Sequence, residues 1–210
     1  SSLWWKSCES GRCISNWKDL AVKMFIDRIL YPVTSLGPGK RIAIWVSGCS
    51  RHCAGCANPE LWNRYEYQKI TPVKLARMIE EVITEEVDGL TISGGEPFEQ
   101  AEELADLIGL LSSDLNILVF SGYRYEELLE KEEAGRLLSK TDVLVDGEYI
   151  DELNDNSSVL RGSSNQKIRY LNKNVQETFE EYLKEGRKIQ NFVYEYKTVS
   201  VGIHNRGKRP

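Results

Sequence analysis

Residues 42–56, IAIWVSGCSRHCAGC, join a short apolar strand to a cysteine-rich loop. Residues 42–46 are apolar and rich in β-branched side chains, which predicts a buried strand. The turn signal Gly37-Pro38-Gly39 stands shortly before this strand. The strand and the loop after it are the first unit of a pattern that continues along the chain.

Predicted strands and helices alternate after the cysteine-rich loop. A helix starts at Thr71-Pro72, a second helix covers 101–111 and a third covers 125–138 with a break near Gly135, while residues 89–93, 116–120 and 143–146 are predicted strands. Such alternation predicts an α/β fold whose parallel strands are joined by right-handed crossovers. The units are fewer than the eight of a closed barrel, so we predict an incomplete, TIM-like barrel of parallel strands with outer helices, laterally open.

The regular alternation weakens beyond the last of these strands. Residues 151–172 are polar and are predicted to form loops. A further helix is predicted over 175–183, and a terminal hairpin over 192–196 and 199–203.

Charge and composition exclude several classes of partner. The 210 residues carry 27 Lys and Arg against 32 Asp and Glu, a net charge of -5, so we expect no nucleic-acid partner. No apolar run approaches the roughly 20 residues that cross a bilayer, and the first residues lack a secretory signal pattern. We therefore expect a cytoplasmic protein with no membrane partner.

Cys49, Cys53 and Cys56 form a C-x3-C-x2-C arrangement directly after a predicted strand. Three thiolates on one loop can hold an inorganic cluster and leave a fourth iron open, because ordinary iron–sulfur sites use four cysteines. The alternative is a zinc ion completed by His52, His204 or an N-terminal cysteine. Tetrahedral zinc sites usually combine two separated ligand pairs, so the spacing favours iron–sulfur over zinc.

A second motif, Ser93-Gly94-Gly95-Glu96-Pro97, ends the strand 89–93. Paired glycines allow a ligand to approach the main chain, and exposed carbonyls with the Glu96 carboxylate can accept hydrogen bonds from an ammonium group. Taken alone, such a turn is more often a plain strand-to-helix loop. Both motifs follow the carboxyl ends of strands, where ligands bind in α/β sheets.

The two motifs together resemble the radical S-adenosylmethionine superfamily, and the chain is most similar to the activating proteins of anaerobic (class III) ribonucleotide reductase. The resemblance covers roughly residues 25–170. The stretches that carry the closer likeness are GPGKR at 37–41, CAGCAN at 53–58 with Trp62 following, SGY at 121–123, and VDG at 145–147 continuing to RGSSNQ at 161–166.

The resemblance implies a division of the chain and a set of site residues. Residues 1–23 would be an N-terminal extension, 24–172 the radical S-adenosylmethionine core, and 173–210 a C-terminal helix and hairpin packed on that core. Cys49, Cys53 and Cys56 would hold a 4Fe-4S cluster whose fourth iron takes S-adenosylmethionine. The cofactor-binding residues implied are Ser93, Gly94, Gly95 and Glu96 at the methionine end, Ser121 and Tyr123 near the sugar or adenine, and Asp146 and Arg161, for which a structural ion pair is the alternative.

The resemblance also implies an activity. The reduced enzyme would cleave S-adenosylmethionine to a 5′-deoxyadenosyl radical and generate a glycyl radical on the anaerobic reductase, with flavodoxin or ferredoxin as reductant. One alternative is a related enzyme that acts on another glycyl-radical enzyme or on a peptide. The other is a binding module stapled by zinc. Cys8 and Cys13 are expected to be free thiols.

Overall fold

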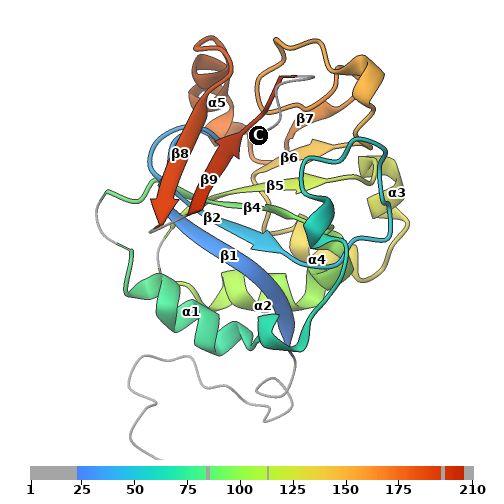
Figure 1. Cartoon of the computed structure of the whole chain (residues 1–210). Coiled ribbons are helices and arrows are strands. Elements are labelled where there is room, and N and C mark those ends of the chain that lie inside the picture. Colours follow the sequence, from blue (N-terminus) through green and yellow to red (C-terminus); the bar gives the residue numbers. More distant parts are fainter. Residues whose placement is uncertain (1–22, 84–85, 113, 195–196, 206–210) are drawn as a thin grey trace, which may run out of the picture.

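A computed structural model describes residues 23–83, 86–112, 114–194 and 197–205, and a seven-stranded sheet organises it (Figure 1). The strand order across the sheet is β3-β1-β2-β4-β5-β6-β7, and β8 and β9 form a separate hairpin. The strands are β1 Met24–Val33, β2 Arg41–Val46, β3 Lys69–Ile70, β4 Gly89–Gly94, β5 Asn116–Ser121, β6 Val143–Asp146, β7 Lys167–Tyr170, β8 Ile189–Tyr194 and β9 Lys197–Gly202.

The centre of the sheet is parallel and its margins are antiparallel. Strands β2, β4, β5 and β6 pair in parallel, which confirms the predicted α/β class with a parallel-rich sheet. Strands β1 and β3 on one margin and β7 on the other run antiparallel, which differs from the prediction of parallel strands alone. The reason at β1 is the short connection to β2, because a parallel pair needs a crossover of about a dozen residues or more.

Three strands lie where the sequence pattern did not predict them, whereas the predicted helix break is present close to its expected place. Strands β1 and β3 were not predicted, and β7 falls within the stretch 151–172 that was predicted to form loops. The helix predicted over 125–138 is two helices, α3 Tyr125–Leu129 and α4 Ala134–Leu138. Gly135 lies inside α4, where a Cβ would meet open space, so the break precedes this glycine.

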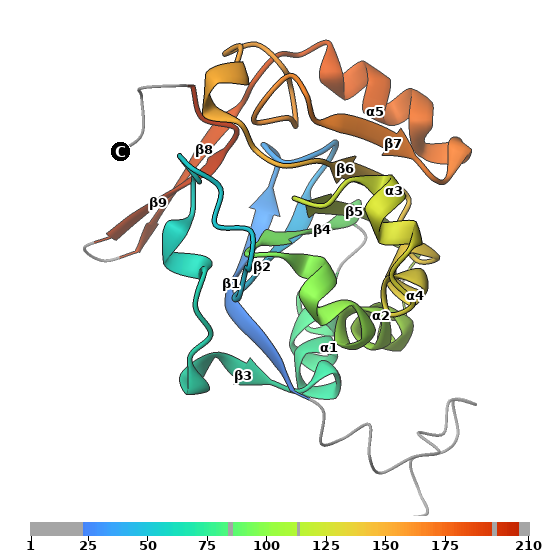
Figure 2. The same ribbon diagram turned by 90° about the vertical axis from the view of Figure 1, so that its right-hand side faces the viewer.

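The helices α1 Pro72–Glu80 and α2 Ala101–Leu110 lie with α3 and α4 on one side of the sheet (Figure 2). The Thr71 hydroxyl caps α1 by accepting a hydrogen bond of 3.2 Å from Lys74 N, as the Thr-Pro signal predicts. Ile42, Ile44 and Val46 of β2 belong to the apolar core on this side. These helices therefore bury one complete face of the sheet.

The C-terminal elements cover the opposite face. These elements are α5 Gln176–Leu183 and the β8–β9 hairpin. Trp45, the neighbour of Ile44 along β2, packs in a second apolar cluster with Val201 of β9. Alternate residues of β2 thus enter different cores, which is why residues 42–46 are all apolar. The predicted helix and hairpin are confirmed, with the first hairpin strand beginning earlier than predicted; residues 195–196 lie outside the described part.

The remaining regular segments are short 3-10 turns. They cover Pro59–Leu61, Glu66–Gln68, Pro97–Gln100, Asp151–Leu153 and Lys173–Val175. No helix in the described ranges is long and apolar enough to cross a membrane. Cys8 and Cys13, predicted to be free thiols, lie outside the described residues.

Candidate functional site

A cavity of about 600 Å³ opens at the carboxyl ends of the central parallel strands. Trp45 and Phe120 from the sheet line it, on the face away from α1 and α2. Most of the site residues predicted from the sequence line this cavity. Those that line it are Cys49, Cys53, Cys56, Ser93, Gly94, Gly95, Glu96 and Ser121.

The cysteine loop folds back on the segment that follows it. Gly48 N donates to Leu61 O at 2.8 Å, and Cys49 N donates to Trp62 O at 3.1 Å. Gly48 has a φ of 101°, a left-handed conformation that favours glycine. The ring of His52 stacks on Trp62 with 4.6 Å between ring centroids. The loop is therefore held by backbone hydrogen bonds and one stacked pair, and its three thiols are left facing the cavity.

The thiols of Cys49, Cys53 and Cys56 are half-buried and form no disulfide. Burial raises the pKa of the Cys49 and Cys53 thiols above the ordinary value. Within the described ranges, no three His, Cys, Asp or Glu side chains are gathered closely enough to hold a single metal ion. The three thiols therefore line the same cavity at separate positions.

The paired glycines after β4 lie directly against the cysteine loop. Gly95 N donates to Val46 O at 2.7 Å, and Glu96 N donates to Gly48 O at 2.8 Å. A Cβ on Gly94 would overlap the carbonyl oxygen of Val46, and one on Gly95 would overlap that of Gly48. The glycines thus allow two backbone segments of the protein to lie close together. The sequence pattern had instead predicted that they let a ligand approach the main chain.

Glu96 joins the ends of β4 and β5. Its Oε1 accepts hydrogen bonds from Phe98 N at 3.0 Å and Ser121 Oγ at 2.9 Å, and its Oε2 accepts one from Gly122 N at 2.7 Å. The side chain is 1% exposed, and this burial raises its pKa to about 7 against the opposing effect of the three hydrogen bonds. The Glu96 carboxylate is therefore engaged in hydrogen bonds within the protein, and it holds the loop after β4 against the loop after β5.

Tyr123 is nominated by the sequence but lies outside the cavity lining. Its ring receives the guanidinium of Arg51 at 4.9 Å and the ammonium of Lys131 at 4.7 Å from the centroid. Arg51 belongs to the cysteine loop and also pairs with Glu148 at 3.2 Å. Tyr123 therefore contacts the site through Arg51.

Asp146 and Arg161 also lie outside the lining, and they do not pair with each other. Asp146 is 2% exposed, accepts a hydrogen bond from Tyr125 N at 2.8 Å and forms an ion pair of 3.0 Å with Arg169. Arg161 donates to Gln166 O at 3.1 Å and to Ser158 Oγ at 3.2 Å. Each contributes to the loops that surround the cavity.

The sequence did not nominate one wall of the cavity. Residues 198–204, in and just after β9, line it together with the cysteine loop. His204 was named only in the zinc alternative, and the other signal of this segment was the hairpin pattern, which carries no chemical information. Asn154 was missed because residues 151–172 were predicted to form polar loops, and Tyr149, just before that stretch, was not singled out.

The cavity fits an iron–sulfur cluster with a bound organic ligand. Three thiolates are the soft donors that such clusters take. Two buried donors of the cavity wall, Arg51 Nε and Trp62 Nε1, have no hydrogen-bond partner among the described residues. An unsatisfied buried donor costs about 1–3 kcal/mol, so a bound group with acceptor atoms suits these positions.

Comparisons with known proteins agree with this arrangement. Residues 35–169 match the family model of the 4Fe-4S single cluster domain. The chain is 31% identical over 151 residues to the anaerobic ribonucleoside-triphosphate reductase-activating protein of Enterobacteria phage T4, covering 69% of this chain and 93% of that protein. It is 31% identical over 149 residues to the protein of that name in Escherichia coli K12, covering 67% and 96%, and 34% identical over 146 residues to the one in Vibrio cholerae, covering 66% and 93%.

A solved structure, QueE from Escherichia coli, aligns with a TM-score of 0.42 and 18% identity over 50% of this chain and 57% of that chain. This likeness is too low to carry an argument about the site.

The chain is a 4Fe-4S single cluster protein of the radical S-adenosylmethionine type. Within that class it belongs to the family of anaerobic ribonucleoside-triphosphate reductase-activating proteins. It is therefore an enzyme whose cofactors are an iron–sulfur cluster and S-adenosylmethionine. This membership decides between the iron–sulfur and zinc alternatives in favour of the former.

Proposed function

We propose that this enzyme generates a glycyl radical on an anaerobic ribonucleotide reductase. A 4Fe-4S cluster and S-adenosylmethionine held in the cavity would supply one-electron cleavage to methionine and a 5′-deoxyadenosyl radical, and this radical would take a hydrogen atom from a backbone glycine of the reductase. The observation that carries the proposal is the shared cavity, which is lined by the three cysteines of the motif and by the Gly-Gly-Glu loop. Its relatives supply the class of protein substrate through their names.

We propose that Cys49, Cys53 and Cys56 are the three cluster ligands. Their loop is short and bound to the segment 61–62 by backbone hydrogen bonds, which fixes where the thiols lie before a cluster is present. Deprotonation of the raised-pKa thiols accompanies cluster binding, because the thiolate is the ligand form.

The other nominated residues take two kinds of role in this proposal. Ser93, Gly94 and Gly95 present backbone atoms to the amino end of S-adenosylmethionine, while Glu96 and Ser121 hold that loop against the end of β5. Three residues act indirectly, because each already contacts side chains or backbone of the protein itself: Tyr123, Asp146 and Arg161. Arg51 links Tyr123 to the cysteine loop.

We further propose that the sheet is an incomplete, laterally open barrel. Two features support this: the helices α1 to α4 lie together on one side, and the cavity lies on the other, as the interior of a barrel does. The proposed division keeps residues 24–172 as the core and 173–210 as a C-terminal helix and hairpin packed on it. The apolar contacts of Val201 with the β1–β2 region agree with that packing.

The proposal includes a reductant and a compartment. A flavodoxin or a ferredoxin, the reductants that the family resemblance implies, would supply the single electron. A reducing compartment, the cytoplasm, suits three half-buried thiols that must not be oxidised before the cluster binds.

The decisive experiment is anaerobic reconstitution followed by two assays. Dithionite-reduced protein is expected to release 5′-deoxyadenosine from S-adenosylmethionine, and addition of an anaerobic ribonucleotide reductase is expected to give a glycyl-radical signal in electron paramagnetic resonance. Cleavage without this signal would contradict the proposed substrate. Stoichiometric zinc without iron or sulfide would contradict the whole proposal.

A related enzyme acting on another glycyl-radical protein or on a peptide is the second candidate. One observation favours it: the matched family region ends at residue 169, whereas the wall of the cavity at 198–204 lies beyond it. A radical signal on such a partner, absent with the reductase, would identify this candidate.

A further inference from the structure

The β8–β9 hairpin makes an unusual contribution to the cavity. Side chains of a strand alternate between its two faces, so a cavity that faces one side of a strand is lined by every second residue. Here seven consecutive residues, 198–204, line the cavity, and none of β8 does. The cavity therefore meets β9 along its edge, on the side that is not paired with β8.

The hairpin is fastened at the β1–β2 connection. Ser35 Oγ donates to Val201 O at 2.9 Å, and Gln190 joins Thr34 N at 2.9 Å and Pro32 O at 2.8 Å. Val201 is 2% exposed and packs with the apolar cluster that contains Trp45. This fastening fixes one side of the hairpin to the core.

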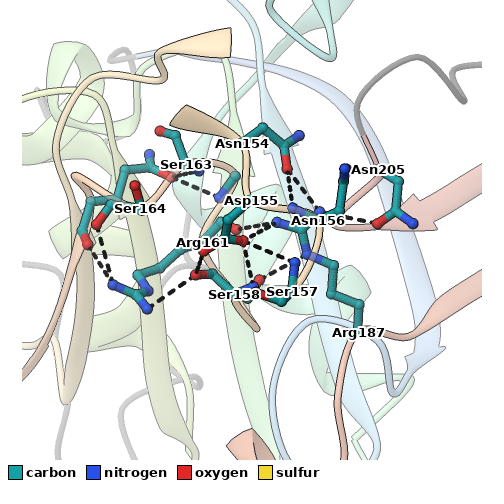
Figure 3. Close-up of polar contacts among 12 residues, drawn as sticks. Asn154, Asp155, Asn156, Ser157, Ser158, Arg161, Ser163, Ser164, Arg187 and Asn205 are labelled. Atoms are coloured by element: carbon teal, nitrogen blue, oxygen red, sulfur yellow. Dashed lines mark hydrogen bonds and ion pairs between the residues drawn. The ribbon is translucent and has the colours of Figure 1, made fainter. Parts of the chain in front are cut away.

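Arg187, just before β8, fastens the hairpin to the loop before β7 (Figure 3). Its guanidinium donates to Asn154 Oδ1 at 3.0 Å, to Ser158 O at 2.9 Å and to Arg161 O at 3.2 Å, all in the loop before β7. It also donates to His204 O at 3.1 Å, immediately after β9. One side chain thus joins both ends of the hairpin to one loop.

The surroundings of Arg187 favour a rigid connection. Its side chain is 7% exposed, and Asp155 lies 3.6 Å from Nη2 as the nearby countercharge. Asn154 reinforces the link by donating its own hydrogen bond of 3.2 Å to His204 O. A planar guanidinium is suited to several directed hydrogen bonds at once, which a lysine ammonium cannot reproduce in the same geometry.

We propose that the β8–β9 hairpin, positioned by Arg187, is the wall of the radical cavity along which an extended glycine-containing segment of the protein substrate lies. The inference rests on the proposed function and adds to it how the substrate is held. An unpaired strand edge offers main-chain N–H and C=O groups to an extended peptide, so recognition there depends on backbone shape. This suits a reaction whose target is a backbone carbon.

Hydrogen exchange tests the wall directly. On adding anaerobic reductase to the reconstituted wild-type protein, amide exchange in residues 198–204 is expected to slow. Unchanged exchange in this segment, while the reductase binds, would overturn the proposal. If the reductase neither binds nor acquires a radical, the proposed function fails for that partner. Hydrogen exchange of residues 198–204 is then compared with and without a synthetic extended glycine-containing peptide, which tests whether this wall binds such a segment.

The variant Arg187→Gln tests the positioning residue. Without the guanidinium, exchange is expected to rise in both 154–161 and 198–204, and the dissociation constant for the reductase to rise about tenfold, equivalent to about 1.4 kcal/mol. Release of 5′-deoxyadenosine without the reductase is expected to stay within about twofold of wild type, because Arg187 does not line the cavity and its described hydrogen bonds reach none of the three cysteines.

Two further variants complete the experiment. Lys184→Gln removes an exposed positive charge of the same segment, which pairs only with Glu181 among the described contacts, and is expected to bind the reductase as wild type does. Arg187→Lys keeps the charge but not the fork of donors and is expected to recover part of the affinity. If Arg187→Gln loses cleavage and reductase binding to the same extent, the proposed role of Arg187 is refuted. It is also refuted if hydrogen exchange and reductase binding both stay as in the wild type.

Discussion

The backbone N–H of Gly122 donates a 2.7 Å hydrogen bond to Oε2 of Glu96, so the loop after β5 is tied to the loop after β4 by a buried carboxylate. The same carboxylate accepts from Ser121 Oγ and Phe98 N. Two segments that are separate in the sequence thereby form one rim of the cavity. The protonation state of Glu96 is consequently coupled to the folding of that rim.

The pH dependence of stability follows from the raised pKa of Glu96. A folded-state pKa of about 7, above the ordinary 4.5, means that its contribution to stability is fully present below pH 4.5 and is lost as the pH rises through 7. The total loss is about 3 kcal/mol at most, from about 1.4 kcal/mol per pKa unit. We expect Glu96→Gln to remove this component between pH 4.5 and 7, measured by urea unfolding of the apo-protein, and an unchanged pH profile would contradict it.

Substitution of Gly95 by Ala is expected to separate the two loops. The added Cβ would overlap the carbonyl oxygen of Gly48, and neither backbone can move without losing the hydrogen bond from Glu96 N. We expect a lower melting temperature and at least about a tenfold loss of S-adenosylmethionine cleavage, corresponding to about 1.4 kcal/mol.

The matched control for that change is Gly135→Ala. Gly135 lies in α4 with no atom near its Cβ position, so alanine is expected to stabilise the helix by up to about 1 kcal/mol. Cleavage is expected to be unchanged. Equal behaviour of the two variants would show that crowding at Gly95 has no bearing on the site.

Removal of one thiol is expected to prevent cluster assembly. Cys53→Ala leaves two of the three proposed ligands, so the visible absorption of the reconstituted cluster and the release of 5′-deoxyadenosine should both be lost. Cys13→Ala, which changes a cysteine outside the motif, should leave both intact. Near-wild-type iron content and turnover in the Cys53 variant would contradict the ligand assignment.

Arg41 is expected to be essential for folding. It is 0% exposed and donates to Thr91 Oγ1 at 2.6 Å, Leu90 O at 2.8 Å and Asn116 Oδ1 at 2.6 Å. Arg41→Met would leave these acceptors unsatisfied and is expected to cost about 3 kcal/mol or more in the free energy of unfolding. Lys40→Met, at the exposed neighbour paired with Glu86, should leave the urea midpoint close to wild type. Similar midpoints for both variants would contradict the structural role of Arg41.

The central strands and the cysteine motif were predictable because their signals are local. Residues 42–46 of strand β2 are all apolar, and the three cysteines are close in the chain, so a single window of sequence contains each signal. Strand β7 gave no such signal. It is a margin strand of four partly exposed residues, and its pairing with β6 is a long-range contact that its own composition does not encode.

The sequence by itself determined the α/β class, the order of its central units and the residues of the cysteine and Gly-Gly-Glu motifs, because strand period, turn residues and ligand spacing are properties of neighbouring residues. The tertiary structure alone decided that the C-terminal hairpin forms a wall of the cavity, that Glu96 serves the protein's own backbone, and that Arg187 joins the hairpin to the loop before β7. These are contacts between distant segments. Their geometry arises only when both faces of the sheet are covered and buried polar groups must find partners across the fold.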